Sequence, residues 1–482
     1  MGNYDSEKMI NFVGMKKSLF YIMSGALLLF LISGCKKDPV EDPGEDPVVI
    51  PAETIATNKW IYDNMSQYYF WNTQIPTGID NTKEIDPEAY FYKLVYKGKD
   101  YWSYITEDYA SLASELNGDP VTMGYYPAFY LVGSNNVMIV VCYVYPESPA
   151  AEAGLERGDL ILSIDNTLLD TTNYYTKYSG TSYSVQLGAI TNNTLGFTGE
   201  SLSMTARVVS TDPAVHHEVL DIEGHKIGYL SYVEFITGEN DAFLLEMDNI
   251  FNEFKTAGIS DLIVDLRYNP GGEIDAALHL ASEIAPSTVT TSQSIMVNLL
   301  YNNDLQTYLQ NNNYDSYLHY KFKITPANIN MTRVYFLTTS RSASASELLI
   351  TGLDPYMQVV QIGEPTYGKY VGSWVMADDN EEWAMMPIVM KYSNIAGYTD
   401  FIDGVPPDYE VEDDLVDAVP FGDPTDPMIA KAIELATGKI ASGRKAMSRA
   451  AMNFRQIVPK EMNARKNLYI NGMDPITKKL PF

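Results

Sequence analysis

Two short runs of the sequence hold the residue types that cleave amides without a histidine. Residues 342–347 read Ser-Ala-Ser-Ala-Ser-Glu, and their small side chains let a substrate backbone approach a serine hydroxyl. Residues 363–369 end in Lys369, which follows Ser344 by 25 positions. A lysine buried away from water gives up its proton more easily, and the free amine then accepts the proton of an attacking serine. The two runs therefore predict a serine nucleophile with a lysine general base.

A third run, residues 267–272 (Arg-Tyr-Asn-Pro-Gly-Gly), offers backbone N–H groups at Gly271 and Gly272, where no side chain blocks approach. The N–H of Ala345, at the start of a predicted helix, is expected to point to the same place. Donors aimed at a developing oxyanion lower the barrier, since losing one typically costs about 3 kcal/mol. We therefore expect an oxyanion hole made by Gly271 or Gly272 together with Ala345.

Each run also has an ordinary structural interpretation. Ser344 and Glu347 fit a capping box, in which two side chains satisfy N–H groups at a helix start. Asn-Pro-Gly-Gly alone is a turn, and Lys369 alone is a surface lysine. The catalytic interpretation is favoured because all three runs lie at the ends of predicted strands in one unit.

The region that positions these runs alternates strands and helices. Strands are predicted at 227–232, 262–266 and 334–337, and helices at 243–254 and from the glycine pair through Ile284. The last of these strands delivers Ser344. Short strands that each end in a loop and continue into a helix form an α/β layer with its site at the strand ends.

Residues 119–210 carry a different pattern. A strand-like run at 137–144 is followed by a short helix of small residues, a glycine turn and a second strand. This order resembles the core of PDZ domains, which hold an extended peptide as an extra strand and grip its terminal carboxylate with backbone N–H groups. Met123, Gly124, Tyr125 and Tyr126 are the candidate carboxylate loop, although they depart from the usual Gly-Leu-Gly-Phe. A generic β-sandwich fragment is the alternative.

The N-terminal segment has the features of an export signal. Two lysines precede an apolar run at 19–32, too short to span a bilayer comfortably but typical of a signal peptide. The small residues before Cys35 resemble the lipobox of bacterial lipoproteins, in which the cysteine is lipidated, and translation is expected to start at Met15. An ordinary secretory signal with a chance cysteine is the alternative. The acidic Asp-Pro repeats that follow predict an extended tether.

Composition narrows the classes of partner. The 482 residues carry a net charge of −29, which disfavours nucleic acid and anionic lipid. One of the two cysteines is expected to carry lipid and Cys142 lies in an apolar run, so no disulfide is expected in the mature chain. The five histidines show no metal-ligand spacing, so neither a metal nor another cofactor is predicted. Between residues 440 and 482, nine Lys or Arg oppose two acidic residues, which predicts a basic tail that packs on acidic surface or stays mobile.

Four motifs occur in the order found in one peptidase family. Residues 265–272, 342–347, 363–369 and 404–408 (Gly-Val-Pro-Pro-Asp) look like the signatures of the C-terminal processing peptidases, or tail-specific proteases, and the PDZ-like region precedes them as in that family. The resemblance covers roughly residues 119–438. It implies a ClpP/crotonase-like α/β core and a Ser-Lys endopeptidase that recognises substrates near their C-termini.

The resemblance also assigns roles. The nucleophile falls on Ser344, the base on Lys369, and the oxyanion donors on Ala345 and the glycine pair. Many members carry a glutamine four residues after the lysine, where it orients the amine, whereas this chain has Ser373. Its shorter hydroxyl is expected to hydrogen-bond the amine directly or through water.

The sequence predicts six segments along the chain. They comprise a lipoprotein signal peptide at 1–35, a tether at 36–52, a helical domain at 53–118, a PDZ domain at 119–210, a Ser-Lys peptidase core at 211–438 and a basic tail at 439–482.

The predicted function is that of a lipid-anchored serine endopeptidase in the envelope of a Gram-negative-type bacterium, at the outer membrane, cleaving exported proteins whose tails bind the PDZ domain. A weak or inactive peptide- or ligand-binding lipoprotein of the same fold is the alternative. A crotonase-type acyl-CoA enzyme is disfavoured by the export signal and by the lack of a basic phosphate-binding cluster. The oligomeric state stays open.

Overall fold

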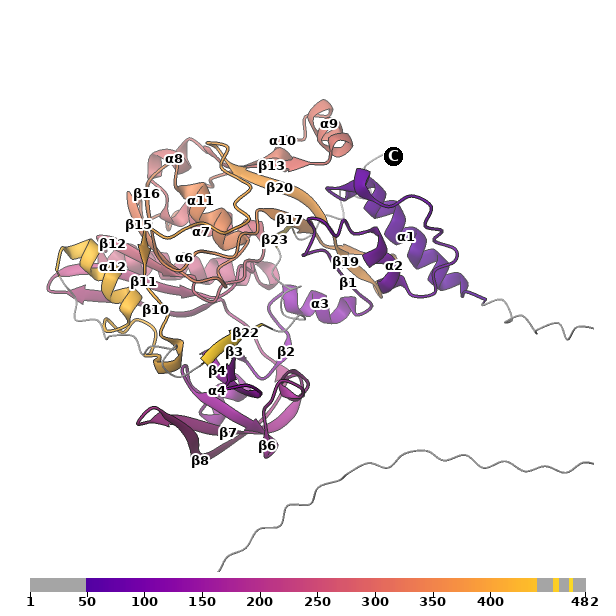
Figure 1. Ribbon diagram of the computed structural model, residues 1–482. Coiled ribbons are helices and arrows are strands. Elements are labelled where there is room, and N and C mark those ends of the chain that lie inside the picture. Colours follow the sequence, from indigo (N-terminus) through magenta and orange to yellow (C-terminus); the bar gives the residue numbers. More distant parts are fainter. Residues whose placement is uncertain (1–48, 440–453, 459–467, 471–482) are drawn as a thin grey trace, which may run out of the picture. The chain divides into compact units, whose positions relative to one another are not determined.

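Three groups of elements make up the described chain: an N-terminal helical region, a PDZ-like β-domain and an α/β core (Figure 1). The computed structural model describes residues 49–439, 454–458 and 468–470. The predicted signal peptide, Cys35 and most of the tether and basic tail lie outside the described residues. Within those residues no helix has both the length and the apolar character needed to cross a bilayer.

The N-terminal region is formed by three helices and a short 3-10 turn, which are α1 (Ala52–Tyr68), η1 (Asn72–Gln74), α2 (Pro87–Leu94) and α3 (Tyr109–Leu116). Helix α2 begins where Asp86 precedes a proline, and the Asp86 carboxylate accepts the N–H of Ala89 at 3.1 Å. Strand β1 (Tyr104–Thr106) pairs with β19 (Ala384–Met386), which in turn pairs with β18 (Met376–Ala377). The region is therefore joined to the core by a shared sheet.

The β-domain is a twisted sheet with two short helices. Its elements are β3 (Tyr125–Val132), β4 (Asn136–Val144), α4 (Pro149–Ala153), β5 (Leu160–Ile164), β6 (Thr167–Leu168), α5 (Tyr174–Tyr178), β7 (Ser182–Thr191) and β8 (Thr194–Thr205). The strand order is β22-β3-β4-β5-β7-β8, with β6 on β5, and its first strand, β22 (Phe454–Ile457), comes from the far end of the chain. A two-stranded ribbon of β2 (Val121–Thr122) and β9 (Arg207–Val208) adjoins it.

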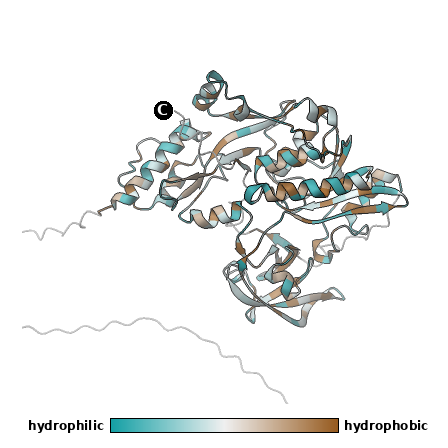
Figure 2. Cartoon of the chain, turned by 180° about the vertical axis from the view of Figure 1, so that it is seen from behind, coloured by the Kyte–Doolittle hydropathy of each residue, from teal (hydrophilic) through white to brown (hydrophobic). Residues whose placement is uncertain are grey.

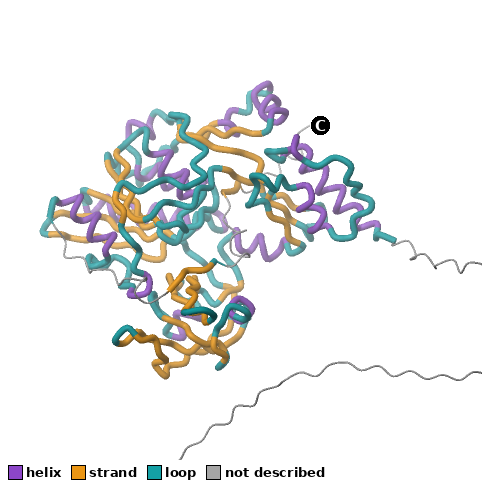
Figure 3. The backbone as a smooth tube through the Cα atoms, viewed as in Figure 1, coloured by secondary structure: helices purple, strands orange, loops and turns teal. Residues whose placement is uncertain are grey.

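The core contains a six-stranded sheet in the order β10-β11-β12-β15-β16-β21. Strand β10 is antiparallel to β11, and the others run parallel. The strands are β10 (Ala214–Ile222), β11 (His225–Tyr232), β12 (Asp261–Asp265), β15 (Arg333–Thr338), β16 (Gln358–Gly363) and β21 (Tyr409–Glu410). Figure 3 shows the alternation of these strands with helices.

Helices cover both faces of this sheet. Helices α6 (Ala242–Ala257), α7 (Ile274–Ile284) and α11 (Ala345–Leu353) share the main apolar core, and α12 (Pro427–Thr437) packs on the opposite face. The central strand β12 is buried throughout because it is covered on both sides, which explains its continuous apolar run. The helices show brown and teal faces in Figure 2, as expected for elements with one buried side.

A second, five-stranded sheet has the order β14-β13-β20-β17-β23. Its strands are β13 (Ile295–Tyr301), β14 (His319–Lys321), β17 (Val371–Trp374), β20 (Ile388–Asn394) and β23 (Leu468–Ile470). Short helices complete the region: η2 (Glu239–Asp241), α8 (Ser287–Thr291), α9 (Asn303–Asn311), α10 (Asp315–Leu318) and η3 (Leu415–Asp417).

Two arginines fix the loop at 267–272. Arg267 is buried and its guanidinium contacts Asp265 at 2.6 Å, Asp413 at 3.0 Å and Asp426 at 2.8 Å. From the β-domain, Arg157 donates to the Tyr268 hydroxyl at 2.8 Å. Buried charges are tolerated only when paired in this way, so the loop is held from the core and from the β-domain.

Candidate active site

Ser344 lies at the turn between β15 and α11, where it is the N-cap residue of the helix. Its backbone has φ 62° and ψ −109°, a conformation that non-glycine residues rarely adopt and that is found mostly where function requires it. The side chain is buried, and its hydroxyl has no hydrogen-bond partner among the described residues.

The neighbouring serines are committed to structure. The hydroxyl of Ser342 donates to the carbonyl of Leu266 at 2.7 Å, and that of Ser346 donates to the carbonyl of Asn269 at 3.1 Å. Of the three serines in the run, Ser344 is therefore the one whose hydroxyl is not used to hold loops together. This agrees with its predicted role as nucleophile.

Lys369 follows the turn at Gly368 and is 0% exposed. Burial holds the pKa of its ammonium well below the usual value, and the negative charges of Asp100 and Glu347 oppose that shift only in part. A lysine in this state supplies the neutral amine that general-base catalysis needs.

Glu347 connects the two predicted catalytic residues. Its Oε2 accepts the backbone N–H of Ser344 at 2.7 Å and that of Lys369 at 2.9 Å. Its Oε1 accepts the hydroxyl of Thr366 at 2.6 Å and the N–H of Gly368 at 2.6 Å. Burial raises the pKa of this carboxyl, and the four donors act in the opposite direction. The capping and catalytic interpretations are therefore compatible, since the Glu347 carboxylate that accepts the N–H of Ser344 also holds the lysine loop.

Tyr392 on β20 makes a second connection. Its hydroxyl lies 3.1 Å from the carbonyl oxygen of Ser344 and 3.1 Å from that of Lys369. Because a phenol has one proton to donate, the two carbonyls share it. No sequence signal pointed to Tyr392, which is 23 residues beyond the lysine.

The glycine pair lies against the serine. An added Cβ at Gly271 would stand 2.6 Å from the Cβ of Ser344, so only glycine fits there. The N–H of Gly271 donates to Asn269 Oδ1 at 2.8 Å. Gly272 is thus the better placed of the two as an oxyanion donor. Ala345 is the first residue of α11, where N–H groups have no intrahelical acceptor.

Ser373 lies on β17 and is wholly buried. Its hydroxyl has no hydrogen-bond partner among the described residues, so it makes no hydrogen bond with the amine of Lys369 there. The prediction that Ser373 orients the amine gains no support from this placement.

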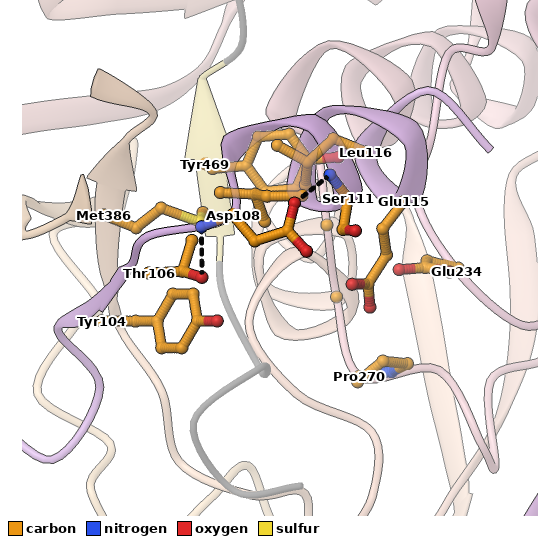
Figure 4. Close-up of a pocket in the computed structure, with 13 residues that line it drawn as sticks. Tyr104, Thr106, Asp108, Ser111, Glu115, Leu116, Glu234, Pro270, Met386 and Tyr469 are labelled. Carbon is orange, nitrogen blue, oxygen red and sulfur yellow. Dashed lines mark hydrogen bonds between the residues drawn. The ribbon is translucent and has the colours of Figure 1, made fainter. Parts of the chain in front are cut away.

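A cavity of about 150 Å³ opens beside the glycine pair (Figure 4). Three carboxylates line it, from Asp108, Glu115 and Glu234, and Tyr469 closes one side. Asp108 is used as the cap of α3, where it accepts the N–H of Ser111 at 3.0 Å. Figure 4 shows Glu115 and Glu234 extending toward the same space. The sequence patterns did not identify these residues, because they come from separate elements brought together only by the fold.

A second cavity, of about 630 Å³, reaches the predicted carboxylate loop of the β-domain. Tyr125 and Tyr126 line it, and it shares Ser111, Glu115, Glu234 and Pro270 with the first cavity. In the same loop, Met123 accepts the N–H of Ala150 and Gly124 accepts that of Tyr145. Tyr125 and Tyr126 therefore line a cavity that shares part of its wall with the cavity at the glycine pair, whereas the carbonyls of Met123 and Gly124 hold the loop to residues 150 and 145.

One group within the described residues has metal-ligand geometry. Single ligand atoms of Asp248, His279 and Glu283 lie within 4.8 Å of one another. The His279 ring is hydrogen-bonded to Asp248 at 2.7 Å, and Thr325 donates to Glu283. These hydrogen bonds account for the cluster, so no metal is assigned to it.

Three regions of the chain match known protein families. Residues 226–411 match Peptidase family S41, residues 56–104 match the Peptidase S41 N-terminal domain and residues 140–178 match a PDZ domain. The predicted mixed α/β fold with a PDZ domain and an N-terminal helical region is confirmed. The predicted domain boundaries stay predictions.

Similar proteins include carboxyl-terminal-processing proteases and a solved S41 protease. A carboxyl-terminal-processing protease from Synechocystis sp. is 25% identical over 313 residues, covering 63% of this chain and 66% of that protein. Carboxy-terminal processing protease CtpB from Bacillus subtilis is 25% identical over 244 residues, covering 49% of this chain and 45% of that protein. A crystal structure assigned as an S41 protease from Bacteroides fragilis matches with a TM-score of 0.66 at 27% identity, covering 79% of this chain and 97% of that one.

The alignments span slightly less than two thirds of the Synechocystis protein and less than half of the Bacillus one. Three family models nevertheless match in the order N-terminal domain, PDZ domain and S41 peptidase domain. The chain therefore contains a peptidase family S41 domain, preceded by an S41 N-terminal domain and a PDZ domain.

Proposed function

We propose that the protein is a serine endopeptidase in which Ser344 attacks a peptide bond and Lys369 is the general base. The observation that carries this proposal is the joint placement of the two residues. Ser344 holds an unpartnered, buried hydroxyl on a strained turn, and the pKa of the buried lysine is lowered well below its usual value. Both are tied to the one carboxylate of Glu347.

Cleavage proceeds in two stages, acylation of Ser344 and hydrolysis of the resulting ester. The Lys369 amine takes the proton of the Ser344 hydroxyl as the oxygen attacks the carbonyl carbon of the scissile bond. The N–H groups of Gly272 and Ala345 stabilise the oxyanion that forms. The lysine ammonium then gives its proton to the departing amine, leaving an ester on Ser344. Water, deprotonated by the same amine, attacks this ester, and the ammonium returns its proton to the Ser344 oxygen as the new C-terminus departs.

The test uses casein as a generic unfolded substrate. Wild type is expected to cleave it, while Ser344→Ala and Lys369→Ala are expected to be inactive but folded, as judged by their melting temperatures. Ser346→Ala is the matched control, because its hydroxyl only braces the loop at Asn269, and it should retain cleavage. Equal cleavage by wild type and Ser344→Ala would contradict the proposal, because the cleavage would not depend on Ser344. It would favour a peptide-binding protein of the same fold without peptidase activity.

Substrate delivery by the PDZ domain is part of the proposal. The cavity at Tyr125 and Tyr126 and the cavity at the glycine pair share four lining residues, which supports a route for an extended chain between them. A tail bound at the β-domain would then enter the site from its C-terminal end. Comparing substrates with free and amidated C-termini tests this, since only a terminal carboxylate engages a carboxylate loop.

The lipid anchor and the envelope location rest on the sequence alone. Small residues precede Cys35 at the end of a signal-peptide-like run, and an acidic tether follows. We propose that the cysteine is acylated and that the enzyme acts on exported proteins from the outer membrane. Metabolic labelling with a fatty-acid analogue should mark wild type and leave Cys35→Ser unmarked. An unlabelled wild type would favour an ordinary secretory signal.

A further inference from the structure

The edge of the β-domain sheet is occupied by the chain's own C-terminal region. Strand β22 pairs antiparallel with β3, with Phe454 opposite Val132 and Ile457 opposite Phe129. Strand β3 begins at Tyr125, so the predicted carboxylate loop at 123–126 is only half loop, since Tyr125 and Tyr126 belong to the strand. Strand β22 runs toward this end of β3. A peptide that adds to a sheet edge in this way makes its affinity from backbone hydrogen bonds and its specificity from alternate side chains.

Side chains of β22 fit the groove beside β3. Ile457 packs against the apolar core of the domain, which includes Phe129, and Phe129 in turn makes edge contacts with Tyr174 and Tyr178 of α5. Ile457 lies directly opposite Phe129 in the antiparallel pair, so its side chain is on the face of the sheet against which α5 packs. The next residue, Val458, is 48% exposed and is not part of this packing.

Gln456 links the same segment to the catalytic loop. With its amide oxygen turned to Arg341, it accepts hydrogen bonds from Nε at 3.0 Å and Nη2 at 2.6 Å. Arg341 also donates to Cys142 on β4 at 3.0 Å. It lies three residues before Ser344, so the segment at the sheet edge touches the loop that carries the predicted nucleophile.

A later part of the tail lies along the oxyanion loop. Strand β23 pairs parallel with β17, and the N–H of Tyr469 donates to the carbonyl of Gly272 at 3.1 Å. The Tyr469 side chain is 4% exposed and closes one side of the cavity at the glycine pair. One region of the chain therefore covers both the sheet edge and the mouth of the site.

We propose that residues 454–457 are an intramolecular ligand of the peptide groove between β3 and α5, and that an incoming extended peptide must displace them. The groove takes a strand with an apolar side chain at the Ile457 position and a hydrogen-bond acceptor at the Gln456 position. The proposal deepens the function above, because displacement is the step that would admit a substrate tail. A tethered competitor is present at high effective concentration, so it sets a threshold that weakly bound chains fail to pass.

The experiment measures peptide binding in the full chain carrying Ser344→Ala, so that nothing is cleaved. The probe is a fluorescent peptide of residues 453–458, Asn-Phe-Arg-Gln-Ile-Val. Adding Ile457→Asp to the chain should release the internal strand and lower the apparent Kd of the probe at least tenfold. Val458→Asp is the matched control and should leave it within twofold. A probe peptide with aspartate at the isoleucine position should not bind either chain.

Gln456→Ala serves as a second variant, because it leaves the strand register and the apolar packing in place. It should lower the apparent Kd of the probe by a smaller factor, about threefold, and should leave the melting temperature near that of the parent. An unchanged Kd in both Ile457→Asp and Gln456→Ala would overturn the proposal and leave β22 a structural strand. A wild-type protein that does not cleave casein would overturn the peptidase proposal instead. The binding assay is independent of this outcome, because it does not use catalysis.

Discussion

Ser344 and Lys369 donate their backbone N–H groups to the same carboxylate oxygen, Oε2 of Glu347, at 2.7 and 2.9 Å. The residues are 25 positions apart in sequence, and they belong to different loops at the ends of β15 and β16. A single buried acceptor therefore sets the separation between the predicted nucleophile and base. Positioning of this kind matters for catalysis, because misplacement by about 1 Å costs up to about 100-fold in rate.

Replacing Glu347 with glutamine tests this role. Glutamine keeps the size but turns an NH₂ group toward two of the four donors, so the loops must separate. We expect kcat to fall by about 10- to 100-fold with a smaller change in KM. We also expect the free energy of unfolding to fall by about 1–3 kcal/mol, because buried donors lose their partner. Glu107→Gln, at an exposed position, is the control for the loss of one charge.

If Glu347 only capped helix α11, the Glu347→Gln variant would give a different result. The stability loss would then appear with kcat unchanged at a temperature where the variant is folded. Denaturant unfolding together with casein kinetics at that temperature separates the two outcomes.

The lowered pKa of Lys369 predicts a pH dependence of stability. In the unfolded chain lysine titrates near 10.4, whereas in the folded protein it loses its proton at lower pH. Between these two pKa values the unfolded state binds more protons, so stability rises with pH there, by at most about 1.4 kcal/mol per pH unit for one group. The penalty of burying the ammonium is absent above the unfolded pKa and is complete below the folded one.

Lys369→Met removes this titration. The variant should be inactive yet more stable than wild type near neutral pH, and the difference should shrink as the pH approaches 10. Urea unfolding of both proteins from pH 7 to pH 10 measures it. A constant difference across this range would mean that the lysine is not desolvated in the folded protein. Lys369→Arg should also be inactive, because a guanidinium does not deprotonate.

The fit of Gly271 against the serine predicts that no side chain is tolerated there. An alanine Cβ would lie 2.6 Å from the Cβ of Ser344 and 2.9 Å from the carbonyl oxygen of Ala343, at a φ of 109°. Gly271→Ala should therefore reduce kcat by at least about 100-fold by moving the nucleophile. Gly133→Ala is the matched control, since its φ of 66° carries backbone strain but nothing lies within 4 Å of an added Cβ.

Gly133→Ala and Gly271→Ala should therefore lose similar stability but differ in activity. Melting temperatures report the strain that both share, and casein cleavage reports the displacement of Ser344. If Gly133→Ala and Gly271→Ala lost the same activity, strain rather than contact with the serine would be the cause.

The sequence predicted the local features of the fold well. Buried strands such as β12 and helices with one apolar face have periodicities that are visible in the chain, and Ser344 was placed correctly at the start of α11. The resemblance to a peptidase family supplied the order of motifs. These signals depend on neighbours in sequence.

Contacts between distant segments were not predictable in the same way. Tyr392 carries no motif, and the acidic side chains near the glycine pair come from α3 and from the strand that ends before Glu234. The basic tail was expected to pack on acidic surface or stay mobile, but its described residues form strands β22 and β23, because their backbones complete two sheet edges. Charge composition does not reveal such pairing.

Ser373 provides the last prediction, since its role as an orienter of the amine is unsupported by any hydrogen bond. Its hydroxyl is buried on β17 without a partner among the described residues, and an unsatisfied buried hydroxyl is a cost to folding. Ser373→Ala should therefore leave kcat within about threefold of wild type and keep or raise the melting temperature. Thr366→Ala is the comparison, because its hydroxyl donates to Glu347 at 2.6 Å and its loss should slow catalysis. A tenfold or larger fall in kcat for Ser373→Ala, with its pH profile shifted to higher pH, would instead establish that the serine hydroxyl acts on the Lys369 amine.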